Sequence, residues 1–240
     1  MDYFLTDTYF EDRQENFCER LLALSKTHMC YMPQQHSLPS YGRRTAGAAF
    51  GCFNNFAKVT PPVIDCWGEL LRQLPQARLL LEIHGAEEDA FADDIRQRFV
   101  AAGARPEQVD ILPRRAGQQY VLYRQVDLAL DPFPCCGGTT SCDSLWMGVP
   151  FVTLAGNSFV SRMGVTLLHN IGLAELIAQD VAGYQALVLA LARDLPRLRA
   201  LREGLRERVQ TSPLMDGPRF ARHFAQGLQQ MWQAQIGRAQ

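Results

Sequence analysis

The sequence predicts an α/β fold: a Rossmann-like parallel sheet with helices on both faces, followed by C-terminal helices. Two observations predict this class. From residue 48 to residue 156, short apolar runs alternate with amphipathic stretches of helical period, which is the pattern of βαβ units. Beyond residue 156 most of the chain has helical period, so a helical tail should follow the sheet.

The expected elements follow one another in order. Strands are expected at 48–55, 77–85, 108–113, 126–133 and 150–156. Helices are expected between them at 60–75, 87–103, 117–125 and 139–148. Thr60 suits the N-cap of the first helix, with prolines directly after it, and Gly103 suits the end of the second. A last helix should begin near Asp216 and carry, on one side, Phe220, Phe224, Leu228, Met231 and Trp232.

The first part of the chain lacks this regular alternation. Residues 16–26 have apolar spacing that suits a short helix, and residues 30–47 run through Pro, Gln, Ser and Gly without a period. We therefore expect residues 1–46 to be a linker that wraps a domain. Residues 47–240 should form the Rossmann-like lobe with its helical tail.

Composition excludes several classes of protein. The net charge is −1, so a general nucleic-acid or anionic-membrane surface is not indicated. No apolar run approaches the roughly 20 residues that span a bilayer, and the acidic N-terminal stretch does not resemble a signal peptide. The seven cysteines contain no CxxC pair, which favours free thiols in a reducing cytoplasm over a metal site or a redox pair.

The loop after the fourth expected strand is a candidate phosphate cradle. Ligands of open α/β sheets bind outside the carboxyl ends of the strands. Gly137 and Gly138 allow close backbone approach there, and Thr139 and Thr140 then open a helix whose N-terminus favours an anion. The alternative is a plain glycine turn with a threonine cap. Asp143, one turn further, either reaches a ribose hydroxyl or only complements the helix dipole.

Two further loops lie at the same expected edge. Lys58, one of only two lysines, follows the first strand and is either a point charge for a phosphate or a solvated side chain. Asn55 beside it is either a turn residue or a phosphate donor. Arg114 follows the third strand, where backbone groups can pair with a base edge or the side chain simply faces solvent. The sequence contains neither GxGxxG nor a P-loop, and no GxSxG elbow.

Several longer stretches carry a family resemblance. They cover residues 50–67, 126–156, 161–168 and 212–221, with shorter pieces at 2–7 and 30–34. Together they resemble the C-terminal half of the O-linked N-acetylglucosamine transferase family, including its bacterial relatives and the SPINDLY-type proteins. The resemblance implies one lobe of a GT-B glycosyltransferase, which binds the UDP-sugar donor. It identifies residues 2–7 and 30–34 with the piece that links the two catalytic lobes of the family.

The resemblance also implies roles for single residues. Lys58 matches the lysine that contacts the diphosphate and is needed for activity, and Asn55 stands where the family often has Gln near the phosphates. Thr139 and Thr140 match the pair that donates to the diphosphate, and Asp143 matches the acid that holds the ribose. The family's remaining contacts fall on positions that read the base or flank the phosphate, namely the backbone at Arg114, Gln119 in place of a stacking His, and Gly138 in place of the His of animal members.

The function implied is that of the donor-binding lobe of an inverting UDP-GlcNAc:protein Ser/Thr O-glycosyltransferase. No metal is expected, in agreement with the lack of a DxD motif. The family's N-terminal catalytic lobe and tetratricopeptide repeats do not occur in these 240 residues, so we expect no transfer by them alone, whether they are a piece of a longer enzyme or one lobe of a split or degenerate one. The alternatives are a GT-B lobe for another sugar or acceptor and a non-catalytic interaction module.

Overall fold

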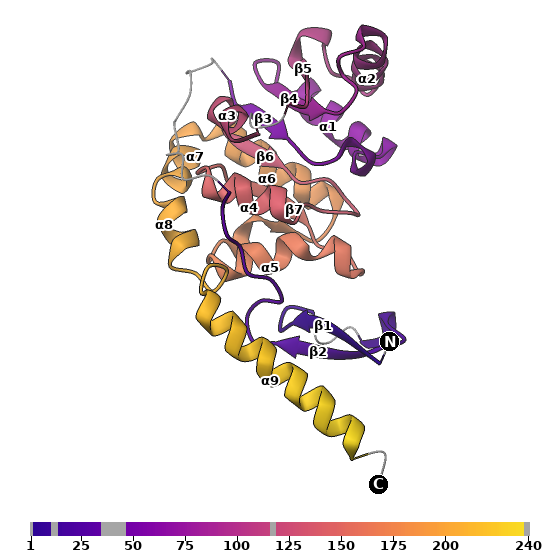
Figure 1. Cartoon of the computed structure of the whole chain (residues 1–240). Helices are drawn as coiled ribbons and strands as arrows, with labels where there is room; N and C mark the ends of the chain where they lie inside the picture. Colours follow the sequence, from indigo (N-terminus) through magenta and orange to yellow (C-terminus); the bar gives the residue numbers. More distant parts are fainter. Residues whose placement is uncertain (1, 11–13, 35–46, 116–118, 238–240) are drawn as a thin grey trace.

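The computed structural model describes residues 2–10, 14–34, 47–115 and 119–237, apart from the side chain of Gln119 (Figure 1). Its centre is a six-stranded sheet in the order β5-β4-β3-β6-β7-β8, and every neighbouring pair is parallel. The expected parallel sheet is therefore confirmed. The strands are β3 (Ala49–Cys52), β4 (Arg78–Ile83), β5 (Val109–Pro113), β6 (Leu128–Leu130), β7 (Phe151–Leu154) and β8 (Ile177–Ala178).

Helices cover both faces of this sheet. Contacts group α1, α2 and α6 on one face, and α4 and α5 against β7 on the other. α1 and α2 lie on the face opposite α4 and α5 because right-handed crossovers run outward from β3 in one direction and from β6 in the other, and α6 follows the last strand, β8. The helices bounding the sheet are α1 (Pro61–Gln73), α2 (Asp89–Ala101), α3 (Gln119–Leu122), α4 (Thr139–Trp146), α5 (Met163–Asn170) and α6 (Val181–Arg193).

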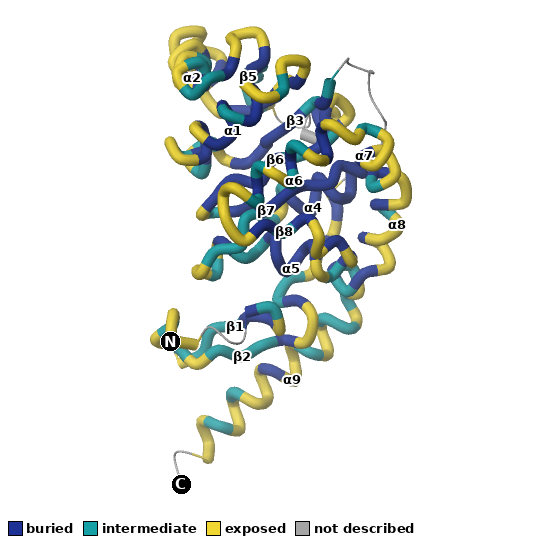
Figure 2. Tube along the Cα trace, turned by 180° about the vertical axis from the view of Figure 1, so that it is seen from behind, coloured by how far each residue is buried: buried dark blue, intermediate teal, exposed yellow. Residues whose placement is uncertain are grey.

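The core lies between the sheet and these helices. Figure 2 shows the central strands and the inner turns of the helices as buried, whereas the edge strand β5 is mostly half-buried. α1 illustrates how the sequence builds this core: prolines occupy its first turn, and its apolar face turns Val63, Trp67 and Leu70 inward until all three are fully buried. Thr60 is the N-cap residue, as predicted, but its side chain makes no capping hydrogen bond.

The helical tail continues with α7 (Leu195–Arg202), α8 (Leu205–Gln210) and α9 (Gly217–Ile236). The carboxylate of Asp216 caps α9 by accepting a hydrogen bond from the amide of Arg219, at the predicted start of the helix. α9 extends away from the sheet, and the predicted apolar side of the helix remains largely exposed (Figures 1 and 2). Trp232 is 67% exposed. No helix of the described residues is long and apolar enough to cross a bilayer.

A second, two-stranded sheet lies beside α9, formed by β1 (Tyr3–Asp7) and β2 (Arg20–Leu24) in parallel. The prediction of a short helix at 16–26 is therefore wrong. The apolar residues of this stretch pair with β1 and pack against α9, so tertiary contacts override a weak helical pattern. α9 approaches closely at Gly227, where a Cβ atom would lie 3.0 Å from Leu22 Cδ2.

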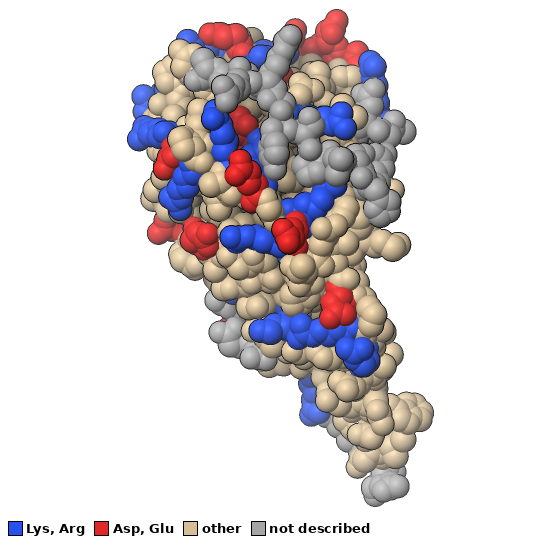
Figure 3. Space-filling view, turned by 90° about the vertical axis from the view of Figure 1, so that its left-hand side faces the viewer, with Lys and Arg blue, Asp and Glu red and all other residues tan. Residues whose placement is uncertain are grey.

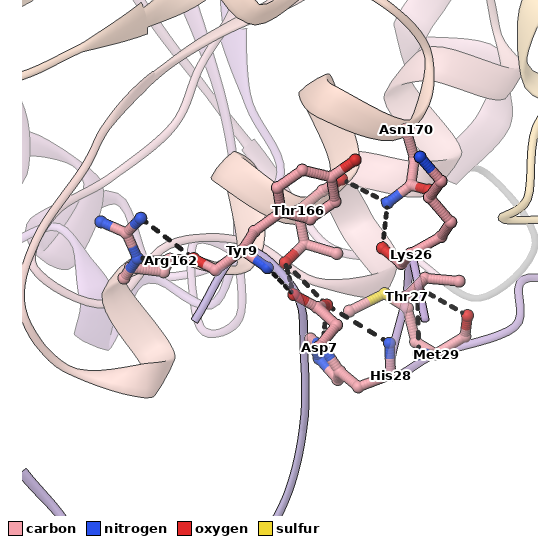
Figure 4. Close-up of polar contacts among 9 residues, drawn as sticks. All are labelled: Asp7, Tyr9, Lys26, Thr27, His28, Met29, Arg162, Thr166 and Asn170. Carbon is pink, nitrogen blue, oxygen red and sulfur yellow. Dashed lines mark hydrogen bonds and ion pairs between the residues drawn. The ribbon is translucent and has the colours of Figure 1, made fainter. Parts of the chain in front are cut away.

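A polar joint fastens this small sheet to the main lobe (Figure 4). Asp7 is fully buried at the end of β1, and it accepts hydrogen bonds from the Thr166 hydroxyl of α5 at 2.9 Å and from the Tyr9 amide at 3.0 Å. The Nδ1 atom of His28 lies 2.6 Å from Asp7 Oδ2, the oxygen that also accepts from Thr166. The Arg162 side chain donates to the Tyr9 carbonyl. The joint satisfies a buried carboxylate from three segments of the chain, which fixes the N-terminal sheet against α5.

Candidate functional site

The candidate site lies where the strand order of the main sheet reverses. Counted from the first strand of the main sheet, the order β5-β4-β3-β6-β7-β8 is 3-2-1-4-5-6, so the reversal falls between β3 and β6. Doubly wound sheets bind ligands in the crevice outside the carboxyl ends of the two strands at this point. The loop that follows β3 carries Lys58. The loop that follows β6 carries residues 136–138, here called the glycine segment, which lead into Thr139 and Thr140 at the start of α4. The topology thus brings two of the predicted loops together.

Lys58 makes the direct contact between the two loops. It ends a short 3-10 turn, Phe56–Lys58, which is separated from the end of β3 by three residues. Its Nζ atom donates a hydrogen bond to the Cys136 carbonyl at 2.9 Å, across a sequence separation of 78 residues. Lys58 is half-buried, and this hydrogen bond holds its ammonium group at the beginning of the glycine segment. A cationic side chain that binds a phosphate of this segment would occupy the same place.

A buried carboxylate, Asp131, shapes the glycine segment from below. Its Oδ1 accepts from the Gly137 amide and its Oδ2 from the Thr153 hydroxyl, both at 2.7 Å. Burial raises the pKa of Asp131 to about 7, and its hydrogen bonds and the charge of Lys58 oppose that rise. Gly137 has no room for a side chain, because a Cβ atom would lie 2.2 Å from Ser141 Oγ.

The N-terminus of α4 completes this side of the site. Gly138 is its N-cap residue, and the Gly138 carbonyl accepts hydrogen bonds from the Ser141 and Cys142 amides. The first amides of a helix lack acceptors within the helix, so those of Thr139 and Thr140 are the ones left for a ligand. Thr139 is exposed and Thr140 half-buried, so both lie at the surface of the cradle. The geometry is that of an anion site at a helix end.

Asp143 lies one turn further along α4 and is only 7% exposed. Its Oδ1 accepts hydrogen bonds from the Tyr31 hydroxyl at 2.7 Å and from the Tyr120 hydroxyl at 2.8 Å. Burial raises the pKa of Asp143, whereas the two hydroxyl donors and the charge of Arg114 lower it. Two hydroxyl donors therefore fix the orientation of the Asp143 carboxyl group.

The remaining predicted residues lie around this centre in less committed positions. Asn55 is exposed, and its Oδ1 accepts from the Ala57 amide, so the side chain caps the 3-10 turn. Arg114 follows β5, where its amide donates to the Ile83 carbonyl and its Nε lies 3.9 Å from the buried Glu82 carboxylate. Gln119 begins α3, but its side chain lies outside the described residues.

Two of the three cysteines between residues 135 and 142 are buried, unreactive thiols. All seven cysteines are free, and burial raises the pKa of both Cys136 and Cys142 to about 12, which keeps these thiols protonated and unreactive. The Cys136 thiol donates to the Val160 carbonyl at 2.9 Å, a structural contact. Among the described residues, no three His, Cys, Asp or Glu side chains gather as metal ligands would.

Sequence reasoning missed three residues of this site. Asp131 directly follows the apolar residues 128–130. A lone acidic residue at the end of a buried strand is a sequence signal for a structural or functional carboxylate. Tyr31 and Tyr120 gave no such signal, because their role arises only when the fold places them beside Asp143.

The fold is that of one lobe of a GT-B glycosyltransferase, as two similar solved structures show. A sucrose-phosphate synthase from Thermosynechococcus elongatus matches 97% of this chain and 59% of its own with a TM-score of 0.63 at 15% identity, a likeness of fold alone. A mutant O-GlcNAc transferase from Thermobaculum terrenum matches 100% of this chain and 46% of its own, with a TM-score of 0.90 at 31% identity.

The model of glycosyl transferase family 41 matches residues 2–224, and the chain belongs to this family. Its relatives include a protein of Oryza sativa subsp. japonica named as a probable UDP-N-acetylglucosamine–peptide N-acetylglucosaminyltransferase SPINDLY. The two are 35% identical over an alignment of 243 positions, which covers 97% of this chain and 26% of the rice protein. The chain therefore spans about a quarter of the length of that curated relative.

Proposed function

We propose that this chain is the donor-binding lobe of a UDP-GlcNAc:protein Ser/Thr O-glycosyltransferase. The observation that carries the proposal is the contact of Lys58 with the glycine segment that leads into α4, which joins a cation and a helix N-terminus at the switch point. The names of the rice relative and of the Thermobaculum terrenum enzyme support UDP-GlcNAc as donor and a protein as acceptor. The family resemblance of Thr139, Thr140 and Asp143 supports the diphosphate and the ribose as their ligands.

The chemistry of such a site is attack by a Ser or Thr hydroxyl on the anomeric carbon of the sugar. The bond from that carbon to the diphosphate breaks as the new bond forms on the opposite face, so the configuration inverts. The attacking hydroxyl gives up its proton to a general base as its oxygen bonds to the sugar, and we propose that the further part of the relatives supplies this base. Negative charge then builds on the departing UDP. Lys58 and the amides of Thr139 and Thr140 are preorganised where that charge would develop, and this is the form of stabilisation that accelerates such reactions most. We propose that these groups suffice for the diphosphate without a metal ion.

The acceptor and the compartment are part of the same proposal. We propose that transfer needs the further part that the relatives of this chain have, and that the present residues alone bind the donor without transferring it. The seven free cysteines favour a reducing, cytoplasmic compartment. Nucleic acid and membrane are not proposed as partners. On the face of the molecule in Figure 3, the basic and acidic side chains of the described residues are interspersed and form no extended surface of one sign.

Calorimetric titration with UDP tests this proposal. Lys58→Ala should weaken UDP binding at least about tenfold, since a hydrogen bond to a charged group contributes about 1.5–3 kcal/mol. The matched control is Lys26→Ala, which removes the chain's other lysine and should leave the affinity unchanged.

The same titration, repeated with UDP-GlcNAc and other sugar nucleotides and joined by a peptide transfer assay, separates the alternatives. Equal affinities for the wild-type protein and Lys58→Ala would contradict the assignment of Lys58. Preference for another sugar nucleotide over UDP-GlcNAc would indicate a GT-B lobe with a different donor. Absence of binding by every uridine nucleotide would favour a non-catalytic interaction module. Measurable transfer to a peptide by these 240 residues would show that no further lobe is needed.

A further inference from the structure

We infer that Tyr31 and Tyr120 are positioning residues that orient Asp143 for recognition of the donor's ribose. Both hydroxyls donate to the same carboxylate oxygen, Oδ1, at 2.7 and 2.8 Å. The second oxygen, Oδ2, is then the one that accepts from a ribose hydroxyl. We call these three residues the tyrosine clamp. The inference rests on the proposed function, since it takes the ligand beside α4 to be a nucleoside diphosphate.

The clamp is a buried and convergent arrangement. Tyr31 is 8% exposed, Tyr120 is 1% exposed and Asp143 is 7% exposed, so solvent does not compete for these hydrogen bonds. A carboxylate can swing about its side-chain bonds when only water contacts it. Two donors on one oxygen, arriving from two directions, leave a single orientation, and binding then costs little further ordering of this side chain.

The three residues come from distant parts of the chain. Tyr31 belongs to the segment that follows the small sheet. Its amide donates to the Leu214 carbonyl at 2.7 Å, which anchors Tyr31 to the loop between α8 and α9. Tyr120 belongs to α3, one residue after Gln119, the position that the family resemblance assigns to base stacking. The Gln34 amide donates to the Tyr120 hydroxyl at 3.4 Å. The clamp therefore ties the N-terminal segment, the base side and the ribose side to one carboxylate.

The clamp also favours the ionised form of the carboxylate. Burial raises the pKa of Asp143, and the hydroxyls of Tyr31 and Tyr120 work against that rise because they donate to the ionised form. An ionised carboxylate is a pure acceptor, as a ribose hydroxyl requires. Removing one hydroxyl should loosen the orientation of Asp143 and raise its pKa, so ribose recognition would weaken and require a higher pH.

The experiment compares UDP with 2′-deoxy-UDP and 3′-deoxy-UDP by calorimetry. We expect the wild-type protein to prefer UDP by about tenfold over at least one deoxy analogue, which is the loss of one hydrogen bond to a charged acceptor. In Tyr31→Phe and in Tyr120→Phe this preference should fall several-fold, while the affinity for that deoxy analogue changes little. The pH at which UDP binding is half lost on acidification should rise in both variants.

A control and a second variant keep the test decisive. Tyr9→Phe removes a tyrosine hydroxyl outside the clamp, from a ring that stacks on His169, and should leave the preference unchanged. The two clamp variants are independent, so one of them suffices if the other does not fold. An unchanged ribose preference and an unchanged pH profile in a folded clamp variant would overturn the clamp and leave the proposed function standing. Absence of UDP binding by the wild-type protein would overturn both.

Discussion

Single residues set the electrostatics of the candidate site, and Asp131 shows how. It is fully enclosed between β6, the glycine segment and Thr153, and it holds the Gly137 amide in place. The sequence predicts a role for Lys58, because a rare lysine in a loop at the ligand edge is a recognisable signal, and the structure places this lysine against the Cys136 carbonyl. The tyrosines beside Asp143 were not predictable, since a sequence separation of 112 residues between Tyr31 and Asp143 leaves no local pattern. Only the packed fold reveals such partners.

Asp131 should give the protein a distinctive pH dependence. Its pKa is about 7 in the folded protein against an ordinary value of 3.8, so between these limits the folded state holds a proton that the unfolded state has released. The free energy of unfolding should therefore fall as pH rises from about 4 to about 7 and level off above. Asp131→Asn, which does not ionise, should show a flatter slope over this window.

Chemical denaturation of both proteins at several pH values between 4.5 and 8 measures this effect. The difference between the wild-type protein and Asp131→Asn removes the contributions of other titrating groups. Parallel pH profiles for the two proteins would show that Asp131 does not titrate in this range.

At the scale of elements, alternation of strands and helices was predictable and the N-terminal sheet was not. The helices and strands from β3 to β7 follow amphipathic or apolar runs with caps and breakers, so their signals are local. The β2 strand has the same apolar residues that a short helix would use. Its identity is decided by pairing with β1 and by the approach of α9 at Gly227, both of which are non-local contacts. The two-residue strand β8 is too short for any periodicity to show.

The polar joint around Asp7 should contribute much of the free energy that attaches the small sheet to the main lobe. Thr166→Val keeps the shape of the side chain but removes a donor from the fully buried Asp7, so it should lower the free energy of unfolding by about 1–3 kcal/mol. Thr211→Val is the matched control, because the exposed Thr211 hydroxyl bonds only within the last turn of α8 and contacts no buried charge. Urea denaturation compares the two variants. Equal effects would show that the joint contributes nothing beyond an ordinary threonine.

At the scale of the whole molecule, the strand order decides where function lies. The sequence predicts a parallel sheet with helices on both faces, but not which strands are neighbours, because register and order depend on contacts between distant strands. Once the order is known, the switch point between β3 and β6 selects the loops of Lys58 and Thr139 from all the others. The switch point therefore brings some of the predicted site residues into one cluster in space. Asn55 lies at the edge of this cluster, where its side chain caps the 3-10 turn.

Ligand binding to this site should stabilise the whole lobe. UDP at a hundred times its dissociation constant should add about 2.7 kcal/mol, which for a chain of this size raises the melting temperature by roughly 5–10 °C. Uridine is the matched control ligand, since it lacks the diphosphate that Lys58 and α4 are proposed to bind, and it should give a much smaller rise. Thermal unfolding followed by fluorescence measures both. Equal shifts for UDP and uridine would show that the diphosphate contributes nothing to binding.

The central claim is that a nucleoside diphosphate binds at the switch point, between Lys58 and the N-terminus of α4. A crystal structure of this chain with UDP tests it most directly. The account predicts phosphate oxygens within hydrogen-bond distance of Lys58 Nζ and of the Thr139 and Thr140 amides, with a ribose hydroxyl on Asp143 Oδ2. A diphosphate bound elsewhere on the protein, or one that leaves Lys58 on the Cys136 carbonyl alone, would contradict it.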